Sequence, residues 1–104
     1  MITAIVTFVL PSAITRERWS KIAASAAPCY ENVPGLMRKQ FLFNHGLGGG
    51  VYLWESRAAA ETCYDGGWRE SIARVAESDP RIAYFETPVV VDKTRGAIAA
   101  AATA

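Results

Sequence analysis

The first ten residues of the chain are rich in β-branched and other apolar residues. The apolar side chains there occupy both faces of an extended segment: Ile5 and Val9 on one, and Val6, Phe8 and Leu10 on the other. Apolar side chains on both faces are typical of a strand buried from two directions. We therefore predict a strand over residues 2–10, which ends at Pro11-Ser12.

From Thr15 onward the apolar residues follow the spacing of an α-helix. The apolar residues that follow the i, i+3, i+4, i+7 pattern are Trp19, Ile22, Ala23, Ala26 and Tyr30. Such spacing places them on one helix face, with Thr15 at the expected N-cap. Pro28 should end or kink this helix, and Pro34-Gly35 predicts a turn.

A β-hairpin is predicted over residues 36–55. Its strands cover residues 36–44 and 51–55, and His45–Gly50 lies between them. Because four of these six residues are glycine, we expect a flexible loop there and no regular element.

A second helical segment and a last strand follow the hairpin. Ser56 is expected to cap an alanine-rich helix through Tyr64, Gly66-Gly67 interrupts it, and an apolar helical pattern resumes at Trp68. Residues 81–92 predict the last strand, with Pro88 at an edge or bulge. We assign residues 1–92 to one domain and residues 93–104 to a low-complexity, alanine-rich tail that is flexible or a frayed helix.

The element order β-α-β-β-α-β predicts an α+β, ferredoxin-like protomer, with a four-stranded antiparallel sheet and helices on one face. Apolar residues nevertheless occupy both faces of the predicted strands, as at Phe41, Leu42 and Phe43, and again at residues 89–91. A large apolar surface is seldom left in water. We therefore predict that the uncovered face packs against a second copy, giving a homodimer.

Charge and composition exclude several classes of partner. The 104 residues carry a net charge of +1, with 20% charged and 51% hydrophobic residues. This balance offers no basic face for nucleic acid and no attraction to an anionic membrane. No apolar run reaches the length of a membrane span, so we expect a soluble, cytoplasmic protein.

Common catalytic and metal-binding patterns are missing from the sequence. Cys29 and Cys63 form no Cys-x-x-Cys or zinc spacing, and we expect two small buried side chains rather than a disulfide or a reactive thiol. The single histidine, His45, is expected on the surface and predicts no metal site. The glycines at 46–50 precede a strand and lack the Gly-Lys-Ser/Thr of a phosphate loop.

Aromatic residues with polar tips are numerous for so short a chain. Three Trp and four Tyr are present, and those on the predicted elements include Trp19, Tyr52, Trp54, Tyr64 and Trp68. Rings with hydroxyl or N–H groups around one cleft suit a planar, partly polar organic ligand. The alternative interpretation is core packing.

Two motifs resemble those of the YdhR-like monooxygenases, in the dimeric α+β barrel superfamily that includes the antibiotic-biosynthesis monooxygenases. These motifs are Pro34-Gly35-Leu36-Met37-Arg38-Lys39 and Gly49-Gly50-Val51-Tyr52-Leu53-Trp54. The resemblance covers about residues 2–92. It implies a sheet-to-sheet homodimer and a cavity where a small aromatic or quinol-type substrate meets dioxygen without a metal, flavin or other cofactor.

The resemblance also implies roles for individual residues. Trp54-Glu55-Ser56 is similar to the Trp-x-Ser stretch of these oxygenases, in which the tryptophan lines the pocket, and Arg74 corresponds to a substrate-contacting arginine. Gly50 and Ala60 stand where the oxygenases have an asparagine and a tyrosine, and Tyr52, Tyr64 or Asn44 are the candidate replacements.

Our candidate catalytic residues are Arg74, Lys39 and Tyr52, and our candidate substrate-binding residues are Trp54, Trp68, Tyr64, Asn44 and Trp19. Arg74 or Lys39 would supply the cation for a developing oxyanion. Arg38 and Lys39 point to opposite faces of their strand, so at most one of them enters a cavity. A non-catalytic small-molecule-binding dimer, or an isomerase or lyase on the same scaffold, remains the alternative function.

Overall fold

Four antiparallel strands form the main sheet in the computed structural model, in the order β2-β3-β1-β4. They are β1 (Ile2–Val9), β2 (Leu36–Asn44), β3 (Leu47–Trp54) and β4 (Arg81–Glu86). The structure describes residues 1–93 and, for the backbone alone, residues 97–100. This strand order confirms the predicted ferredoxin-like topology.

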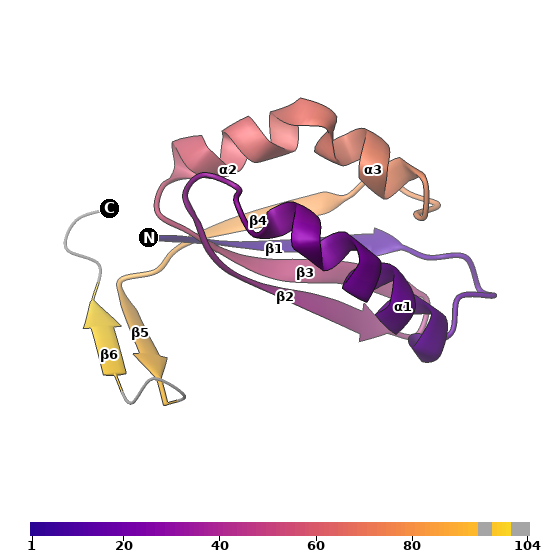
Figure 1. Cartoon of the computed structure of the whole chain (residues 1–104), viewed down its shortest axis with the longest axis horizontal. Helices are drawn as coiled ribbons and strands as arrows, with labels where there is room; N and C mark the ends of the chain where they lie inside the picture. Colours follow the sequence, from indigo (N-terminus) through magenta and orange to yellow (C-terminus); the bar gives the residue numbers. More distant parts are fainter. Residues whose placement is uncertain (94–96, 101–104) are drawn as a thin grey trace.

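The helices cover one face of this sheet (Figure 1). The first is α1 (Arg16–Ala26), continued by one 3₁₀ turn, η1 (Ala27–Tyr30). Its predicted cap is confirmed, since the Thr15 hydroxyl accepts a hydrogen bond from the Arg18 N–H at 3.1 Å. Ser56 caps the second helical segment in the same way, accepting from the Ala59 N–H at 3.1 Å.

The second helical segment bends at the predicted glycine pair. It comprises α2 (Arg57–Cys63), a π-turn η2 (Tyr64–Trp68) and α3 (Arg69–Ala73). Gly66 leaves the helical conformation, with φ −81° and ψ −147°. The π-turn directs Tyr64 and Trp68 toward the sheet, where both side chains are buried.

The expected glycine loop at His45–Gly50 is a misprediction, because β3 already begins at Leu47. Only the turn at residues 45–46 lies outside the two strands, and Gly46 adopts a positive φ of 77° there. A Cβ on Gly49 would stand 1.9 Å from the Val6 carbonyl oxygen of the neighbouring strand. Glycine is required at this position because β3 approaches β1 closely. Local composition alone predicts a loop from the same glycines.

The predicted last strand is divided in two. Thr87 and Pro88 separate β4 from β5 (Val89–Asp92), and β5 pairs with β6 (Ala97–Ala100) in a separate two-stranded sheet beside the main one (Figure 1). Proline has no N–H to donate to a ladder, so the pairing changes at this point. Residues 89–91 therefore do not extend the main sheet, contrary to our expectation.

The alanine-rich tail is described only in part. Ala97–Ala100 forms a strand, where a frayed helix was the alternative expectation. Residues 94–96 and 101–104 lie outside the described residues, so the flexibility of the tail stays a prediction.

The two faces of the main sheet differ in burial. Ala4, Val6, Phe8, Tyr52 and Trp54 lie beneath the helices and are at most 4% exposed. The opposite face carries apolar side chains in contact with solvent, among them Ile5, Leu42, Leu47 and Phe85, which are 36–53% exposed. An apolar outer face was predicted and is present. In the described part of the chain no helix is long and apolar enough to cross a membrane.

Candidate ligand cavity between the sheet and the helices

A small interior cavity of about 100 Å³ lies between the inner face of the sheet and the helices. The predicted apolar face of α1 forms one wall, and β2, β3 and α3 supply most of the remainder. The lining residues are Phe8, Trp19, Ile22, Ala23, Ala26, Tyr30, Lys39, Phe41, Gly49, Tyr52, Ser71, Ile72 and Val75. The lining is apolar apart from a few polar tips, as in ligand sites generally.

A hydrogen-bonded aromatic cluster supports the Tyr52 side of this cavity. The rings of Tyr52 and Trp54 stack in parallel, with centroids 5.9 Å apart and an interplanar angle of 4°. The Trp54 Nε1–H donates to the Tyr64 hydroxyl at 3.2 Å, and the Trp68 Nε1–H donates to the Tyr52 hydroxyl at 3.2 Å. These bonds satisfy buried indole groups and fix the orientation of both tyrosines.

Burial keeps the tyrosines of the site protonated. It raises the pKa of Tyr52, Tyr64 and Tyr30 above the usual value of 10. The Tyr52 oxygen accepts a hydrogen bond from Trp68, and its own proton is directed toward the Tyr30 hydroxyl. The Tyr30 hydroxyl interacts with Tyr52 and Trp68 and extends the same polar chain toward η1.

Lys39 is the cation of the cavity. Its Nζ lies 3.4 Å from the centroid of the Tyr30 ring, 3.9 Å from that of Phe41 and 4.5 Å from that of Tyr52. Within residues 1–93 no carboxylate forms an ion pair with it. Burial lowers the pKa of Lys39 to about 7, because the ammonium loses its water. The amine therefore exchanges its proton near neutral pH.

Arg38 and Lys39 point to opposite faces of β2, as alternation predicted, and the structure shows that Arg38 is the one that points away from the cavity. Its guanidinium is exposed and pairs with Asp92 of β5 at 3.5 Å. Lys39 is therefore the inward residue of the pair, and only one of the two lines the interior cavity, as predicted.

The structure separates our candidate site residues into three groups. Lys39, Tyr52 and Trp19 line the cavity. Trp54, Tyr64 and Trp68 are buried behind Tyr52 and hold it in place, so Trp54 supports the pocket wall and does not form it.

The third group lies away from the cavity. Arg74 follows α3 and is exposed. Asn44 is exposed at the end of β2, where its side-chain oxygen accepts a hydrogen bond from the His45 N–H. We assigned these two residues to the site from the family resemblance alone. Whether a side chain reaches the cavity depends on which face of its helix it occupies and on where its strand ends.

Sequence reasoning missed three polar or aromatic residues of the cavity as site candidates. Tyr30 comes from η1, Phe41 from β2 and Ser71 from α3. Tyr30 continues the apolar face of α1, and Phe41 lies two residues after Lys39 on the same face of its strand. These two spacings were available signals.

Trp19 brings an unusual feature to the cavity wall. Its ring packs edge-on against Phe8 at 5.8 Å, and the side chain is buried. Its Nε1–H has no hydrogen-bond partner among the described residues. A buried donor without a partner costs free energy, which a ligand with an acceptor atom would recover.

A second, outer pocket adjoins the cavity. Its volume is about 260 Å³, and it is lined by residues of η1 and β2, including Met37 and Arg38, and by Glu31, which follows η1. Tyr30, Lys39 and Phe41 line both spaces, so these three side chains form the boundary between them.

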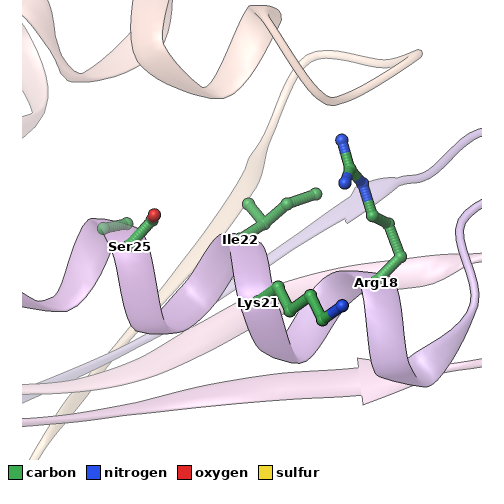
Figure 2. A pocket seen from close by; sticks show the side chains of 5 residues that line it. Arg18, Lys21, Ile22 and Ser25 are labelled. Atoms are coloured by element: carbon green, nitrogen blue, oxygen red, sulfur yellow. The ribbon is translucent and has the colours of Figure 1, made fainter.

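A third hollow lies on the surface of α1 (Figure 2) and has a volume of about 380 Å³. Arg18, Lys21, Ile22, Ser25 and Ala26, all from one helix, line it. Exposed cations on a single helix are the usual solvated surface, and we assign no ligand to this hollow.

The remaining polar candidates lie away from the interior. His45 is exposed in the β2–β3 turn, with its ring 6.3 Å from that of Phe43. Cys29 is exposed and Cys63 half-buried, so the expectation of two buried cysteines is wrong for Cys29. Among the described residues no three His, Cys, Asp or Glu side chains are grouped to hold a metal ion.

Solved structures similar to this chain include a monooxygenase and an oxygenase. A monooxygenase from the gene ActVA-Orf6 of Streptomyces coelicolor, in complex with nanaomycin D, superposes with a TM-score of 0.66 at 16% identity, over 86% of this chain and 89% of that one. SnoaB, a cofactor-independent oxygenase from Streptomyces nogalater, gives 0.61 at 14% identity, over 83% and 91%.

A haem-degrading protein shares the same architecture. MhuD from Mycobacterium tuberculosis, with two haems in its active site, superposes with a TM-score of 0.67 at 23% identity, over 88% of this chain and 100% of that one. No protein-family model and no curated protein sequence matches the chain. The chain therefore has the ferredoxin-like α+β fold that the antibiotic-biosynthesis-monooxygenase-like proteins share.

Proposed function

We propose that this protein is a cofactor-independent, monooxygenase-like enzyme that oxidises a small aromatic or quinol-type compound in the interior cavity. The observation that carries the proposal is Lys39, an amine that faces an aromatic, mostly apolar cavity without a carboxylate partner in residues 1–93. The fold, shared with two oxygenases, agrees with this assignment.

The chemistry uses the substrate as its own electron source. Lys39 in its neutral form takes a proton from an acidic C–H or O–H group, and the resulting ammonium stabilises the carbanion or oxyanion. That anion reduces dioxygen. For an anthrone-type methylene the balance is one CH₂ and one O₂ giving one C=O and one H₂O.

The remaining side chains of the site orient and shield the reacting anion. The protonated hydroxyls of Tyr52 and Tyr30 are donors for the substrate oxygen, and Trp19 forms an apolar wall. Trp54, Tyr64 and Trp68 act through Tyr52 as positioning residues. We propose no role for Arg74 or Asn44, which lie outside the cavity.

We further propose a homodimer formed through the apolar outer face of the sheet, a cytoplasmic location, and a YdhR-like subfamily. The exposed Ile5, Leu42, Leu47 and Phe85 support the dimer, since this face lies opposite the helices. Burying such a face would remove several hundred Å² of apolar surface from water, at roughly 25 cal/mol per Å².

Oxygen uptake with anthrone- and quinol-type compounds tests the enzymatic proposal. We expect uptake above background for the wild-type protein, a loss of at least about tenfold in Lys39→Met, and a smaller loss in Tyr52→Phe and Trp54→Phe. Lys21→Met, on the exposed surface of α1, is the matched control and should retain full activity.

The alternative is a non-catalytic, small-molecule-binding dimer. Two observations favour this alternative. The cavity is small, and the polar groups of four buried rings already form hydrogen bonds with one another, as in a packed core: Trp54 with Tyr64, and Trp68 with Tyr52. Binding of the same compounds without oxygen uptake would support this alternative and reject the monooxygenase. An isomerase or lyase would instead convert them without consuming oxygen.

A further inference from the structure

We infer that the Lys39 amine is a carbonyl-reactive nucleophile, which captures a small apolar aldehyde or ketone as an imine at the boundary of the two pockets. This activity goes beyond the proposed oxidation and needs no dioxygen. It shares the cavity with that function and rests on the position of one amine.

The position of Lys39 gives a carbonyl compound access to the amine. Lys39 lines both the interior cavity and the outer pocket, together with Tyr30 and Phe41. A ligand therefore reaches Nζ from the outer pocket and places its apolar portion against the interior wall. Two of the rings lie within 4 Å of Nζ, at 3.4 Å for Tyr30 and 3.9 Å for Phe41, so the surroundings of the amine are mainly aromatic.

The groups that face Lys39 allow its neutral form. The amine lies against the rings of Tyr30 from η1 and Tyr52 from β3, and it interacts electrostatically with Cys63 from α2. Burial raises the pKa of the Cys63 thiol. The outer pocket adds Glu31 and Arg38, neither of which forms an ion pair with it. Tyr30, Tyr52 and Cys63 are uncharged at neutral pH, and within residues 1–93 no carboxylate forms an ion pair that would hold the amine as ammonium. Burial places the pKa of Lys39 at about 7.

The covalent step balances without an oxidant or reductant. The nitrogen lone pair attacks the carbonyl carbon, so a C–N bond forms while the C=O double bond breaks. The amine nitrogen gives up its two protons, and the carbonyl oxygen takes up two. Water leaves, and the product is the C=N bond of the imine. The hydroxyls of Tyr52 and Tyr30 remain protonated, so they are hydrogen-bond donors for the departing oxygen.

Reductive trapping with benzaldehyde and sodium cyanoborohydride tests the inference, with peptide mapping by mass spectrometry. The chain has three lysines, and Lys21 and Lys93 are exposed internal references. A solvated lysine has an ordinary pKa of about 10.4, so little of it is neutral at pH 7. We expect benzylation of Lys39 to exceed that of either reference by at least about tenfold at neutral pH.

Two further measurements separate reactivity from simple exposure. The labelling rate of Lys39 should rise through about pH 7 and then level off. Lys21→Arg should leave the labelling of Lys39 unchanged. Mapping also distinguishes the N-terminal amine from Lys39.

The inference is overturned if Lys39 is labelled no faster than Lys21 and Lys93, or if its labelling rate does not level off above about pH 7. Labelling is carried out under argon, so it does not depend on oxygen chemistry. Oxygen uptake without selective labelling would reject the imine alone, and selective labelling without oxygen uptake would reject the monooxygenase alone.

Discussion

Lys39 experiences two opposing effects at the residue scale. Loss of hydration disfavours its ammonium, while the faces of Tyr30 and Phe41 attract the positive charge. Burial is the larger effect, so the pKa of the folded-state amine falls from its ordinary 10.5 to about 7. This shift links the stability of the fold to pH.

Between pH 7 and 10.5 the unfolded chain binds more protons at this lysine than the folded chain does. The contribution of Lys39 to the free energy of unfolding therefore rises with pH in that window, by at most about 1.4 kcal/mol per pH unit, and is lowest below pH 7. Lys39→Met should remove this rise.

Urea unfolding of wild type and Lys39→Met between about pH 6.5 and pH 8.5 measures the difference, and the other titrating groups cancel in the comparison. Lys21→Met, which changes an exposed lysine, should keep the wild-type slope. Parallel curves for wild type and Lys39→Met would contradict a lowered pKa in the folded protein.

The Tyr64 hydroxyl accepts a hydrogen bond from the buried Trp54 indole. Tyr64→Phe leaves that N–H without a partner, and we expect a loss of about 1–3 kcal/mol in the free energy of unfolding. Tyr84→Phe, on a half-buried ring 6.4 Å from Tyr64, is the control and should change it by less than about 0.5 kcal/mol. Equal losses of stability in the two variants would show that the hydrogen bond from Trp54 to Tyr64 does not stabilise the fold.

At the scale of elements, the glycines of β3 determine how closely the two central strands pair. A Cβ at Gly49 has no room beside Val6, whereas a Cβ at Gly67 in η2 would meet nothing within 4 Å. Gly49→Ala should lower the free energy of unfolding by about 3 kcal/mol or more, because β1 and β3 must separate. Gly67→Ala should change it by no more than about 1 kcal/mol.

Urea denaturation of both glycine variants distinguishes a packing requirement from a general preference for flexibility. If the two substitutions cost the same, the close approach of β3 to β1 does not explain why glycine stands there.

At the scale of the whole molecule, the chain has one covered and one uncovered sheet face (Figure 1). Ile5 lies on the central strand β1 and is 37% exposed. If a second copy covers this face, Ile5→Glu places a charge in the interface and should yield monomers. Ser25→Glu, on exposed α1, should leave the dimer intact.

Sedimentation velocity at micromolar concentration measures the oligomeric state of the wild-type protein and of both variants. A wild-type chain that sediments as a monomer would contradict the proposed homodimer. Its cavity chemistry would then have to be explained for a single subunit.

Local patterns in the sequence determined most of the elements. Thr15 and Ser56 mark the starts of α1 and α2, and residues 36–44 form β2 as predicted, because caps, turns and alternation act over a few neighbouring residues. Alternation along β2 also determined that Lys39 and Arg38 face opposite ways.

Only the tertiary structure decided the site. The cavity joins Tyr30, Lys39, Tyr52 and Ser71 from four separate elements, and it leaves out Arg74 and Asn44. The course of residues 48–50 likewise depends on the backbone of β1, which is distant in sequence. Such placements depend on strand register and helix packing, which bring distant segments together and which spacing along one segment does not encode.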